Sequence, residues 1–187
     1  VMRAYSISST PDEKNEIELI VRLVPGGIGS TYLHSLKPGD TVTFTGPFGE
    51  FVLDEDPETE LVLVGGGCGM APIKSIIYYA LKKHPNRECW LFFGAREPRD
   101  VFYLEEYQQL AQKCPNFHVI YALSDLKEGQ QWDGETGFIH LAVEKYLEAG
   151  REKRQAFLCG PPPMIEATLE VLEDKELEED RIFYDKF

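Results

Sequence analysis

The sequence predicts an α/β domain with a five-stranded parallel sheet, preceded by a partial antiparallel β-barrel. Three observations support this fold class. Apolar runs alternate with segments of helical period from about Glu60 onward, short strand-like segments with little helix come before it, and an acidic, proline-containing stretch, 54–60, separates the two regions. We therefore expect the 187 residues to form two domains, 1–58 and 59–187.

The region before the acidic stretch is expected to form part of the barrel. Its strand-like segments are 3–8, 16–22 and 41–45, and turn sequences rich in proline, glycine and aspartate separate them. Segment 30–36 is expected to be a short helix with Ser30 at its N-cap, where the hydroxyl can satisfy a free backbone N–H. Because a closed barrel needs about five strands, and the chain starts inside an apparent strand, we expect an N-terminal truncation.

The region after the acidic stretch is expected to form a parallel sheet with helices on both faces. The five expected strands are 61–64, 88–93, 117–122, 155–159 and 181–184. The four expected helices are 72–83, 104–113, 139–149 and 163–174. Ligands of such sheets bind at the carboxyl ends of the strands.

Composition excludes several classes of function. The formal net charge of −13 argues against nucleic-acid binding, because phosphate backbones are held by clustered Lys and Arg. The four cysteines form no closely spaced pair and the four histidines are scattered, so neither a metal site nor an iron–sulfur cluster is expected within the chain. With no signal peptide and no apolar run near the roughly 20 residues that cross a bilayer, we expect no membrane contact by this segment and a cytoplasmic setting.

The glycine-rich segment 65–72, Gly-Gly-Gly-Cys-Gly-Met-Ala-Pro, is the most informative motif. It follows an apolar strand and opens a helix, where free N–H groups and the helix dipole favour an anion such as a dinucleotide pyrophosphate. Met70 stands where the third glycine of the usual G-x-G-x-x-G pattern would be, and no Gly-Lys-Ser/Thr follows, which excludes a P-loop. A tight turn that lets the helix pack closely remains the alternative.

Four motifs in order resemble the ferredoxin-NADP reductase superfamily: Arg3-Ala4-Tyr5-Ser6, the glycine-rich segment, Cys159-Gly160-Pro161-Pro162 and the aromatic-ended tail Tyr184-Asp185-Lys186-Phe187. Together they span nearly the whole chain. The closest resemblance is to the FAD/NADH module of the F subunits of sodium-translocating NADH:quinone reductases, and reductases of multicomponent oxygenases are close behind. The resemblance implies that the barrel binds FAD and that the α/β domain binds NADH.

On the flavin side, the resemblance implies that Arg3 pairs with the FAD pyrophosphate, a role that suits its planar guanidinium. Tyr5 would lie against the isoalloxazine ring, and Ser6 would hydrogen-bond near flavin N5. A second phosphate-binding element is expected at the start of the short helix. Its members are Gly27, Gly29, Ser30 and Thr31, although an ordinary N-cap explains Ser30 equally well.

On the nicotinamide side, the resemblance places the thiol of Cys159 near nicotinamide C4, beside Gly160 and Pro161. Phe187 would cover the other flavin face and move aside for the nicotinamide, so the expected catalytic residues are Cys159, Ser6 and Phe187. The pyrophosphate would be bound by Gly66, Gly67, Gly69 and Pro72. The alternatives are a buried structural cysteine and a terminal aromatic that docks the tail to the core.

The dipeptide Ser124-Asp125 predicts a preference for NADH. In NADPH-specific members of the superfamily a serine followed by arginine grips the 2'-phosphate, whereas Asp125 would repel a phosphate and accept hydrogen bonds from a free ribose hydroxyl. Arg96, after the second strand of the sheet, is expected to touch the nucleotide phosphates. A plain Ser-Asp turn and a solvent-facing arginine are the alternatives.

The expected activity is hydride transfer from NADH to FAD, followed by electron transfer to an iron–sulfur domain or protein, as part of a sodium-translocating NADH:quinone reductase. Segments outside this chain would then hold it at the cytoplasmic face of the inner membrane. A reductase component of a multicomponent oxygenase is the enzymatic alternative. The other alternative is a non-catalytic nucleotide-binding fragment whose incomplete barrel no longer retains FAD.

Overall fold

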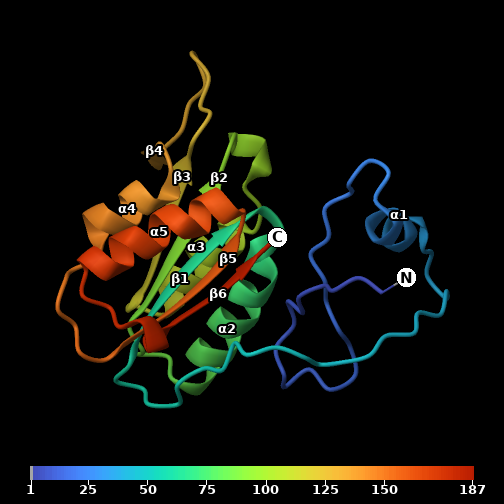
Figure 1. Cartoon of the computed structure of the whole chain (residues 1–187), viewed down its shortest axis with the longest axis horizontal. Helices are drawn as coiled ribbons and strands as arrows, with labels where there is room; N and C mark the ends of the chain where they lie inside the picture. Colours follow the sequence, from blue (N-terminus) through green and yellow to red (C-terminus); the bar gives the residue numbers. More distant parts are fainter. Residues whose placement is uncertain (1) are drawn as a thin grey trace.

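The computed structural model describes residues 2–187 and shows a six-stranded parallel sheet with the N-terminal part of the chain beside it (Figure 1). The strands are β1 (Glu60–Gly66), β2 (Cys89–Ala95), β3 (Phe117–Leu123), β4 (Glu135–Thr136), β5 (Arg154–Gly160) and β6 (Ile182–Lys186). Their order is β4-β3-β2-β1-β5-β6. The five predicted strands are confirmed as β1, β2, β3, β5 and β6, but a total of five is wrong. The sixth, β4, pairs through only two residues, too few to produce a periodic sequence pattern.

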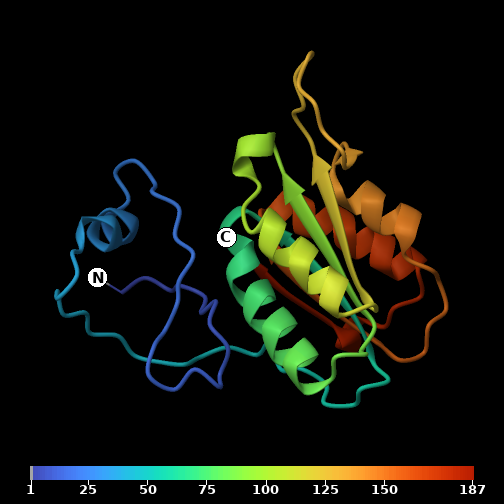
Figure 2. The same ribbon diagram turned by 180° about the vertical axis from the view of Figure 1, so that it is seen from behind.

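Helices cover both faces of the sheet, as the alternating pattern predicts. Helices α2 (Met70–Lys83) and α3 (Leu104–Lys113) lie on one face, and α4 (Ile139–Tyr146) and α5 (Pro162–Asp174) lie on the other (Figures 1 and 2). Strand β1 is buried along its whole length. Leu61 and Leu63 enter the core under α2 and α3, whereas Val62 and Val64 enter the core under α4 and α5.

Helix α4 ends three residues earlier than the predicted 139–149. Leu147, at its C-cap, adopts an extended conformation (φ −87°, ψ 124°) and is 3% exposed, because its side chain turns into the core under α4 and α5. The chain then reaches Gly150, whose φ of +71° lies in the left-handed region. The helical pattern of the sequence extends beyond Tyr146, but burial of Leu147 ends the helix there.

The N-terminal part does not contain the three regular strands that the sequence predicts. Among residues 2–58 the regular elements are helix α1 (Ile28–Ser35) and one isolated antiparallel bridge between Ile7 and Leu19. Segment 41–45 is irregular, and Val42 and Phe44 are exposed. A strand requires a neighbour with which its backbone groups pair, and beyond the Ile7–Leu19 bridge these segments are not paired in a regular ladder. The regular elements of residues 2–58 therefore do not show the predicted partial antiparallel barrel.

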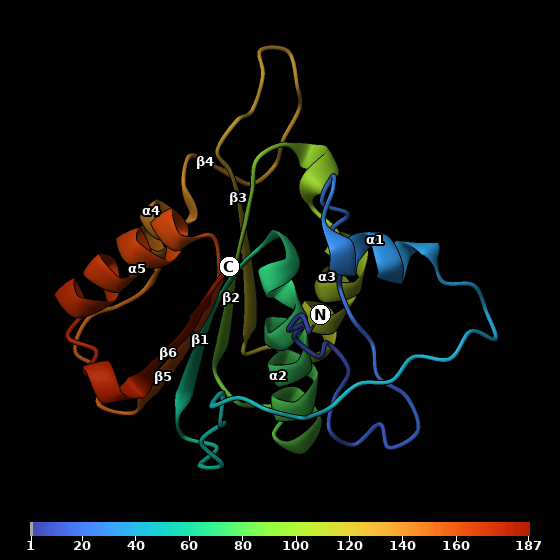
Figure 3. The ribbon, with the colours of Figure 1, turned by 45° about the vertical axis from the view of Figure 1, so that its right-hand side comes forward.

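Residues 51–54, where the chain enters the acidic stretch, connect the N-terminal part to the sheet domain. Phe51 packs its ring 5.4 Å from that of Phe157 on β5. The Gln155 side chain donates to the carbonyl of Val52 (3.0 Å) and accepts from the backbone N–H of Asp54 (2.9 Å). The N-terminal part also lies against α2, through hydrogen bonds to Lys74, Ser75 and Lys82 (Figure 3).

A buried ion pair joins the amino ends of β1 and β5. Arg154 and Glu60 are 1% and 3% exposed, and the Arg154 Nε donates to the Glu60 carboxylate. Arg154 also donates to the carbonyl of Glu148 at 2.7 Å, and Arg151 approaches Glu60 at 3.5 Å. Removing one partner of a buried pair leaves the other charge without compensation.

Replacing Arg154 with leucine is expected to lower the free energy of unfolding by about 3–5 kcal/mol, because the buried carboxyl group of Glu60 then loses its partner. Urea unfolding followed by circular dichroism measures the change. Lys153→Leu is the matched control, since its partner Asp56 and Lys153 itself are both solvent-accessible and such pairs contribute little. Equal losses in the two variants would contradict a special role for the buried pair.

Candidate functional site

Glycines gather where β1, β2 and β5 end, at the carboxyl edge of the sheet. Gly66 at the end of β1 is in register with Gly94 on β2, and Gly65 is in register with Cys159 on β5. Gly160 ends β5. Because the strands are parallel, these positions share one edge, and the backbone there is not covered by the glycines' own side chains. This edge is where open α/β sheets bind their ligands.

The glycine-rich segment contains one glycine that is needed for close packing and another that leaves the backbone open to a ligand. Gly69 permits close packing, because a Cβ there would overlap the carbonyl oxygen of Cys159. Gly67 is exposed with φ +55°, and a Cβ built there would meet nothing within 4 Å. Its left-handed conformation, not crowding, therefore favours glycine. Packing and an open backbone surface thus occur two residues apart in the same turn.

Helix α2 begins directly after this turn. A short 3-10 turn (Gly67–Gly69) leads into Met70, with Gly69 as the N-cap. Pro72 lies in the first helical turn, where its missing N–H would have no intrahelical partner anyway. The Met70 N–H donates to carbonyls of the 3-10 turn. The positive end of the helix dipole therefore faces the carboxyl edge, where it favours an anion.

Cys159 lies one residue before the end of β5 and is 1% exposed. Burial raises the pKa of its thiol to about 12, and the nearby Asp185 and Cys68 add smaller effects in the same direction. The thiol is therefore protonated at neutral pH. It can provide a small, polarisable contact to a ligand at this edge, but it is not a thiolate nucleophile.

The last residue of the chain reaches the same edge. The Phe187 backbone N–H donates to the carbonyl of Gly160 at 3.4 Å, and its side chain is 60% exposed. Pro161 follows Gly160 as the N-cap of α5. The C-terminus lies on the side of the sheet domain that faces the N-terminal part (Figures 1 and 2). The structure therefore brings Cys159, Gly160 and Phe187 together.

The loops after β2 and β3 bring Arg96 next to Ser124 and Asp125. Backbone hydrogen bonds join Ser124 N–H to the Ala95 carbonyl (3.0 Å) and Asp125 N–H to the Arg96 carbonyl (2.9 Å). The Arg96 guanidinium lies 3.5 Å from the Asp125 carboxylate, with both side chains largely exposed. The positive charge of Arg96 is thus offset by the acid beside it.

In the N-terminal part, the Arg3–Tyr5 segment lies against the start of α1. A Cβ at Gly29 would stand 2.5 Å from the Tyr5 hydroxyl and 3.0 Å from Arg3 Cγ. Tyr5 is half-buried, as is Ser6, and Arg3 is exposed. The two segments that the sequence assigns to flavin binding are therefore adjacent, although more than twenty residues separate them.

Ser30 is not the N-cap of α1, so that prediction is wrong. The N-cap is Gly27, and the helix begins at Ile28. The buried Ser30 hydroxyl instead accepts from the backbone N–H of Val24 at 3.1 Å. Thr31, the next residue, is exposed. The Ser30 hydroxyl is thereby engaged within the protein, whereas Thr31 is open to solvent.

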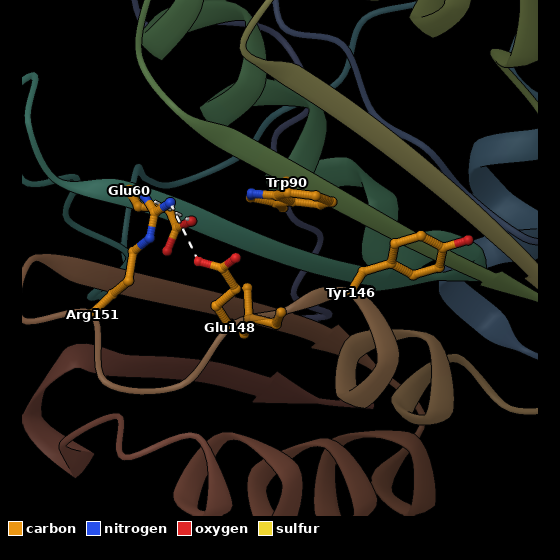
Figure 4. A pocket seen from close by; sticks show the side chains of 6 residues that line it. Glu60, Trp90, Tyr146, Glu148 and Arg151 are labelled. Atoms are coloured by element: carbon orange, nitrogen blue, oxygen red, sulfur yellow. Dashed lines mark ion pairs between the residues drawn. The ribbon is translucent and has the colours of Figure 1, made fainter.

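A cavity of about 140 Å³ lies at the opposite, amino edge of the sheet (Figure 4). Its lining residues are Glu60, Trp90, Tyr146, Leu147, Glu148 and Arg151. Arg151 lies between the carboxylates of Glu60 (3.5 Å) and Glu148 (3.9 Å). The cavity is too small for a dinucleotide and far along the strands from the glycine-rich edge, so it is separate from the candidate cofactor site.

Among residues 2–187 there is no group of three or more His, Cys, Asp or Glu side chains placed to hold a metal ion. Nor does any helix in this range combine the length and the apolar character needed to span a membrane.

Comparison with known proteins identifies two matching domain families. Residues 63–170 match the oxidoreductase NAD-binding domain, and residues 1–53 match the oxidoreductase FAD-binding domain. The glycine-rich turn, Arg96, Asp125 and Cys159 lie within the first match, and Arg3, Tyr5 and Gly29 lie within the second.

Similar proteins of greater length carry a consistent name. The chain is 44% identical to the F subunit of the Na(+)-translocating NADH-quinone reductase of Actinobacillus succinogenes and 43% identical to that of Neisseria gonorrhoeae, in each case over 100% of this chain and 49% of the relative. It therefore spans about half the length of these relatives.

Two solved structures of reductases have a similar fold over nearly the whole of this chain. Amycolatopsis cytochrome P450 reductase GcoB is 35% identical, with a TM-score of 0.87 over 98% of this chain and 55% of that protein. The ferredoxin reductase in carbazole 1,9a-dioxygenase is 28% identical, with a TM-score of 0.80 over 100% of this chain and 56% of that protein. The predicted resemblance to ferredoxin-NADP reductases is confirmed. Since its NAD-binding match covers more than half of its length, the chain belongs to the oxidoreductase NAD-binding domain family, here preceded by an oxidoreductase FAD-binding domain.

Proposed function

We propose that this chain is the electron-entry part of an NADH-dependent flavoprotein reductase, with residues 1–58 binding FAD and residues 59–187 binding NADH. The observation that carries the proposal is the carboxyl edge where Gly69, Cys159 and Phe187 meet. It offers an open backbone at a helix start, a neutral thiol and an exposed aromatic tail within one small area, as expected for a nicotinamide that must approach a second planar ring.

On the NADH side, the start of α2 would hold the pyrophosphate through backbone N–H groups. Gly67 keeps that backbone open, Gly66 and Gly69 let the turn pack closely against Met164 and Cys159, and Pro72 lies in the first helical turn. Cys159 and Gly160 would support the nicotinamide, with Pro161 beginning the next helix behind them. The neutral thiol contributes shape and polarisability without placing a negative charge beside a hydride donor.

On the flavin side, Arg3, Tyr5 and Gly29 are already adjacent. When bound, FAD supplies the ring that accepts a hydride and releases electrons singly. Arg3 would pair with its phosphates, together with the backbone of Gly27 and Gly29 and the hydroxyl of Thr31 at the start of α1. Tyr5 and Ser6 would align the ring, Phe187 would shield it from water, and Ser30 would act through its backbone.

The electrons would then pass to an iron–sulfur domain or protein, within a sodium-translocating NADH:quinone reductase at the cytoplasmic face of the inner membrane. The names of the relatives from Actinobacillus succinogenes and Neisseria gonorrhoeae support the assignment to a sodium-translocating NADH:quinone reductase. A reductase component of a multicomponent oxygenase is the second candidate, favoured by the likeness to the reductases of a cytochrome P450 and of carbazole 1,9a-dioxygenase.

Replacing Asp125 with arginine is expected to lower the preference for NADH over NADPH by about tenfold or more, an energy of about 1.4 kcal/mol. Arg96 then loses its acidic neighbour, and two guanidinium groups can meet the 2'-phosphate. The ratio of kcat/KM for the two nucleotides, with ferricyanide as acceptor, measures the effect. Glu173→Arg on α5 changes the net charge equally at the other edge of the sheet and should leave the ratio unaltered. No gain for NADPH in the Asp125 variant would refute the assignment.

Substitution of Cys159 by alanine is expected to slow flavin reduction by about tenfold or more, because a poorly placed nicotinamide loses the aligned approach that hydride transfer requires. Stopped-flow absorbance at saturating NADH gives the rate. Cys114→Ala removes another buried thiol, at the end of α3, and serves as the control. If both variants reduce flavin at the same rate, Cys159 is a packing residue only.

Removing the charge of Arg3 by the change to alanine should reduce the FAD content of the purified protein, because the pyrophosphate loses a charge-assisted contact. The flavin-to-protein absorbance ratio measures the loss. Arg22→Ala, at another exposed arginine of the same part, should retain FAD. If the Arg3 variant contains as much FAD as the wild type, Arg3 is not needed to bind FAD.

A further inference from the structure

A polar cluster connects the two parts of the chain close to both candidate cofactor elements. The Glu18 carboxylate accepts hydrogen bonds from Lys74 Nζ on its two oxygens, at 2.8 and 2.7 Å. It also accepts from the Tyr103 hydroxyl at 2.9 Å. Glu18 belongs to the N-terminal part, Lys74 to α2, and Tyr103 to the N-cap of α3. We call these three residues the Glu18 clamp.

Glu18 is fixed to the segment that carries the flavin motif. Its backbone carbonyl accepts from Ser8 N–H at 2.8 Å, and its own N–H donates to the Ser9 hydroxyl at 3.1 Å. Ser8 and Ser9 are buried, and Ser6 precedes them by two and three residues. The backbone of Glu18 is therefore hydrogen-bonded to residues that lie two and three positions after Ser6.

Lys74 is equally close to the NADH side. It is the fifth residue of α2, two residues beyond the glycine-rich segment, and its side chain is only 12% exposed. A nearly buried ammonium needs a counter-charge, which Glu18 supplies. The hydrogen bond from Lys74 lowers the pKa of Glu18 and so keeps the carboxylate ionised at neutral pH.

Tyr103 completes the cluster in an uncommon backbone conformation. Its φ of +58° and ψ of 21° lie in the left-handed region, which residues other than glycine seldom occupy. In this conformation its hydroxyl reaches Glu18, and the Lys74 ammonium lies 4.6 Å from its ring centre. Such conformations persist only where surrounding contacts hold them.

A second ion pair between the same two parts provides a contrast. Lys82, two turns further along α2, pairs with Asp12 at 2.9 Å, but the two side chains are 66% and 43% exposed. Exposed pairs of this kind are screened by water and contribute little. The Glu18 clamp differs in the burial of its lysine, in its third member and in its proximity to both cofactor elements.

We propose that Glu18, Lys74 and Tyr103 are positioning residues for hydride transfer. They set the angle between the FAD-binding part and the NADH-binding domain, so that nicotinamide C4 meets flavin N5 at reacting distance. This inference rests on the proposed function. Reacting atoms must approach to about 3–3.5 Å, and a misplacement of about 1 Å can cost roughly 100-fold in rate. A rigid contact between the two cofactor-binding parts supplies that constraint.

The test uses the complete natural polypeptide loaded with FAD and mixed with NADH in an anaerobic stopped-flow instrument. Varying the NADH concentration separates the limiting rate of flavin reduction from the dissociation constant of NADH. Lys74→Met is expected to lower the limiting rate about tenfold or more, with the dissociation constant and FAD content within about threefold of wild type. Tyr103→Phe should give a smaller loss in the same parameter.

Two further variants separate positioning from general destabilisation. Lys82→Met removes the exposed pair and is expected to keep the limiting rate within about twofold of wild type. The double variant E18K/K74E restores an ion pair with reversed polarity and is expected to recover most of the rate lost in Lys74→Met. Recovery by a swapped pair is a result that loss of folding alone cannot produce.

The outcomes are distinct. A Lys74→Met protein with the wild-type limiting rate overturns the clamp, as does a loss that Lys82→Met shares or that the swapped pair does not recover. Wild-type protein whose FAD is not reduced by NADH instead overturns the proposed function itself. A selective loss in the clamp variants, with recovery in the swapped pair, supports the inference.

Discussion

The close approach of the glycine-rich turn to the end of β5 is the constraint on which the rest of the site depends. Gly69 lies against the carbonyl of Cys159 so tightly that any side chain at this position would collide with it. This contact fixes the start of α2 relative to β5. Phe187 is held at the same edge by the hydrogen bond from its backbone N–H to the carbonyl of Gly160.

The sheet domain can maintain this geometry because it has two cores of its own. β1 and β5 are buried along their whole length, and their side chains alternate between the layers under α2 and α3 and under α4 and α5. The N-terminal part, by contrast, exposes Phe44 and Phe48 and depends on contacts to α2 and β5 for its position. The relative placement of the two proposed rings therefore rests on the contacts between the two parts, which include the Glu18 clamp.

The sequence predicts the sheet domain well because its signals are local. Apolar runs of four and five residues, 61–64 and 89–93, identify β1 and β2, and the bounds of α3 follow from its helical period alone. The sequence does not predict β4, because a strand of two residues is too short to show a periodic pattern. The predicted barrel strands fail for another reason: a strand is defined by partners distant in sequence, and Ile7 and Leu19 form only one bridge.

The candidate site is predictable in part for the same reason. The glycine-rich turn and the Cys-Gly-Pro-Pro motif are each an unbroken stretch of sequence, so they can be found by reading the chain. The Glu18 clamp joins residues 56 and 85 positions apart, and neither a lone acid nor a lone lysine carries a signal in the sequence. The N-cap prediction for Ser30 fails because serine suits many N-caps, whereas the structure uses this hydroxyl to hold Val24.

Anaerobic titration of the complete natural polypeptide with NADH tests the central claim most directly. We expect bound FAD whose visible absorbance is lost after one equivalent of NADH, with NADPH acting far more slowly. A protein that binds no flavin, or whose flavin absorbance is unchanged by NADH, would contradict the assignment of this chain as an electron-entry module.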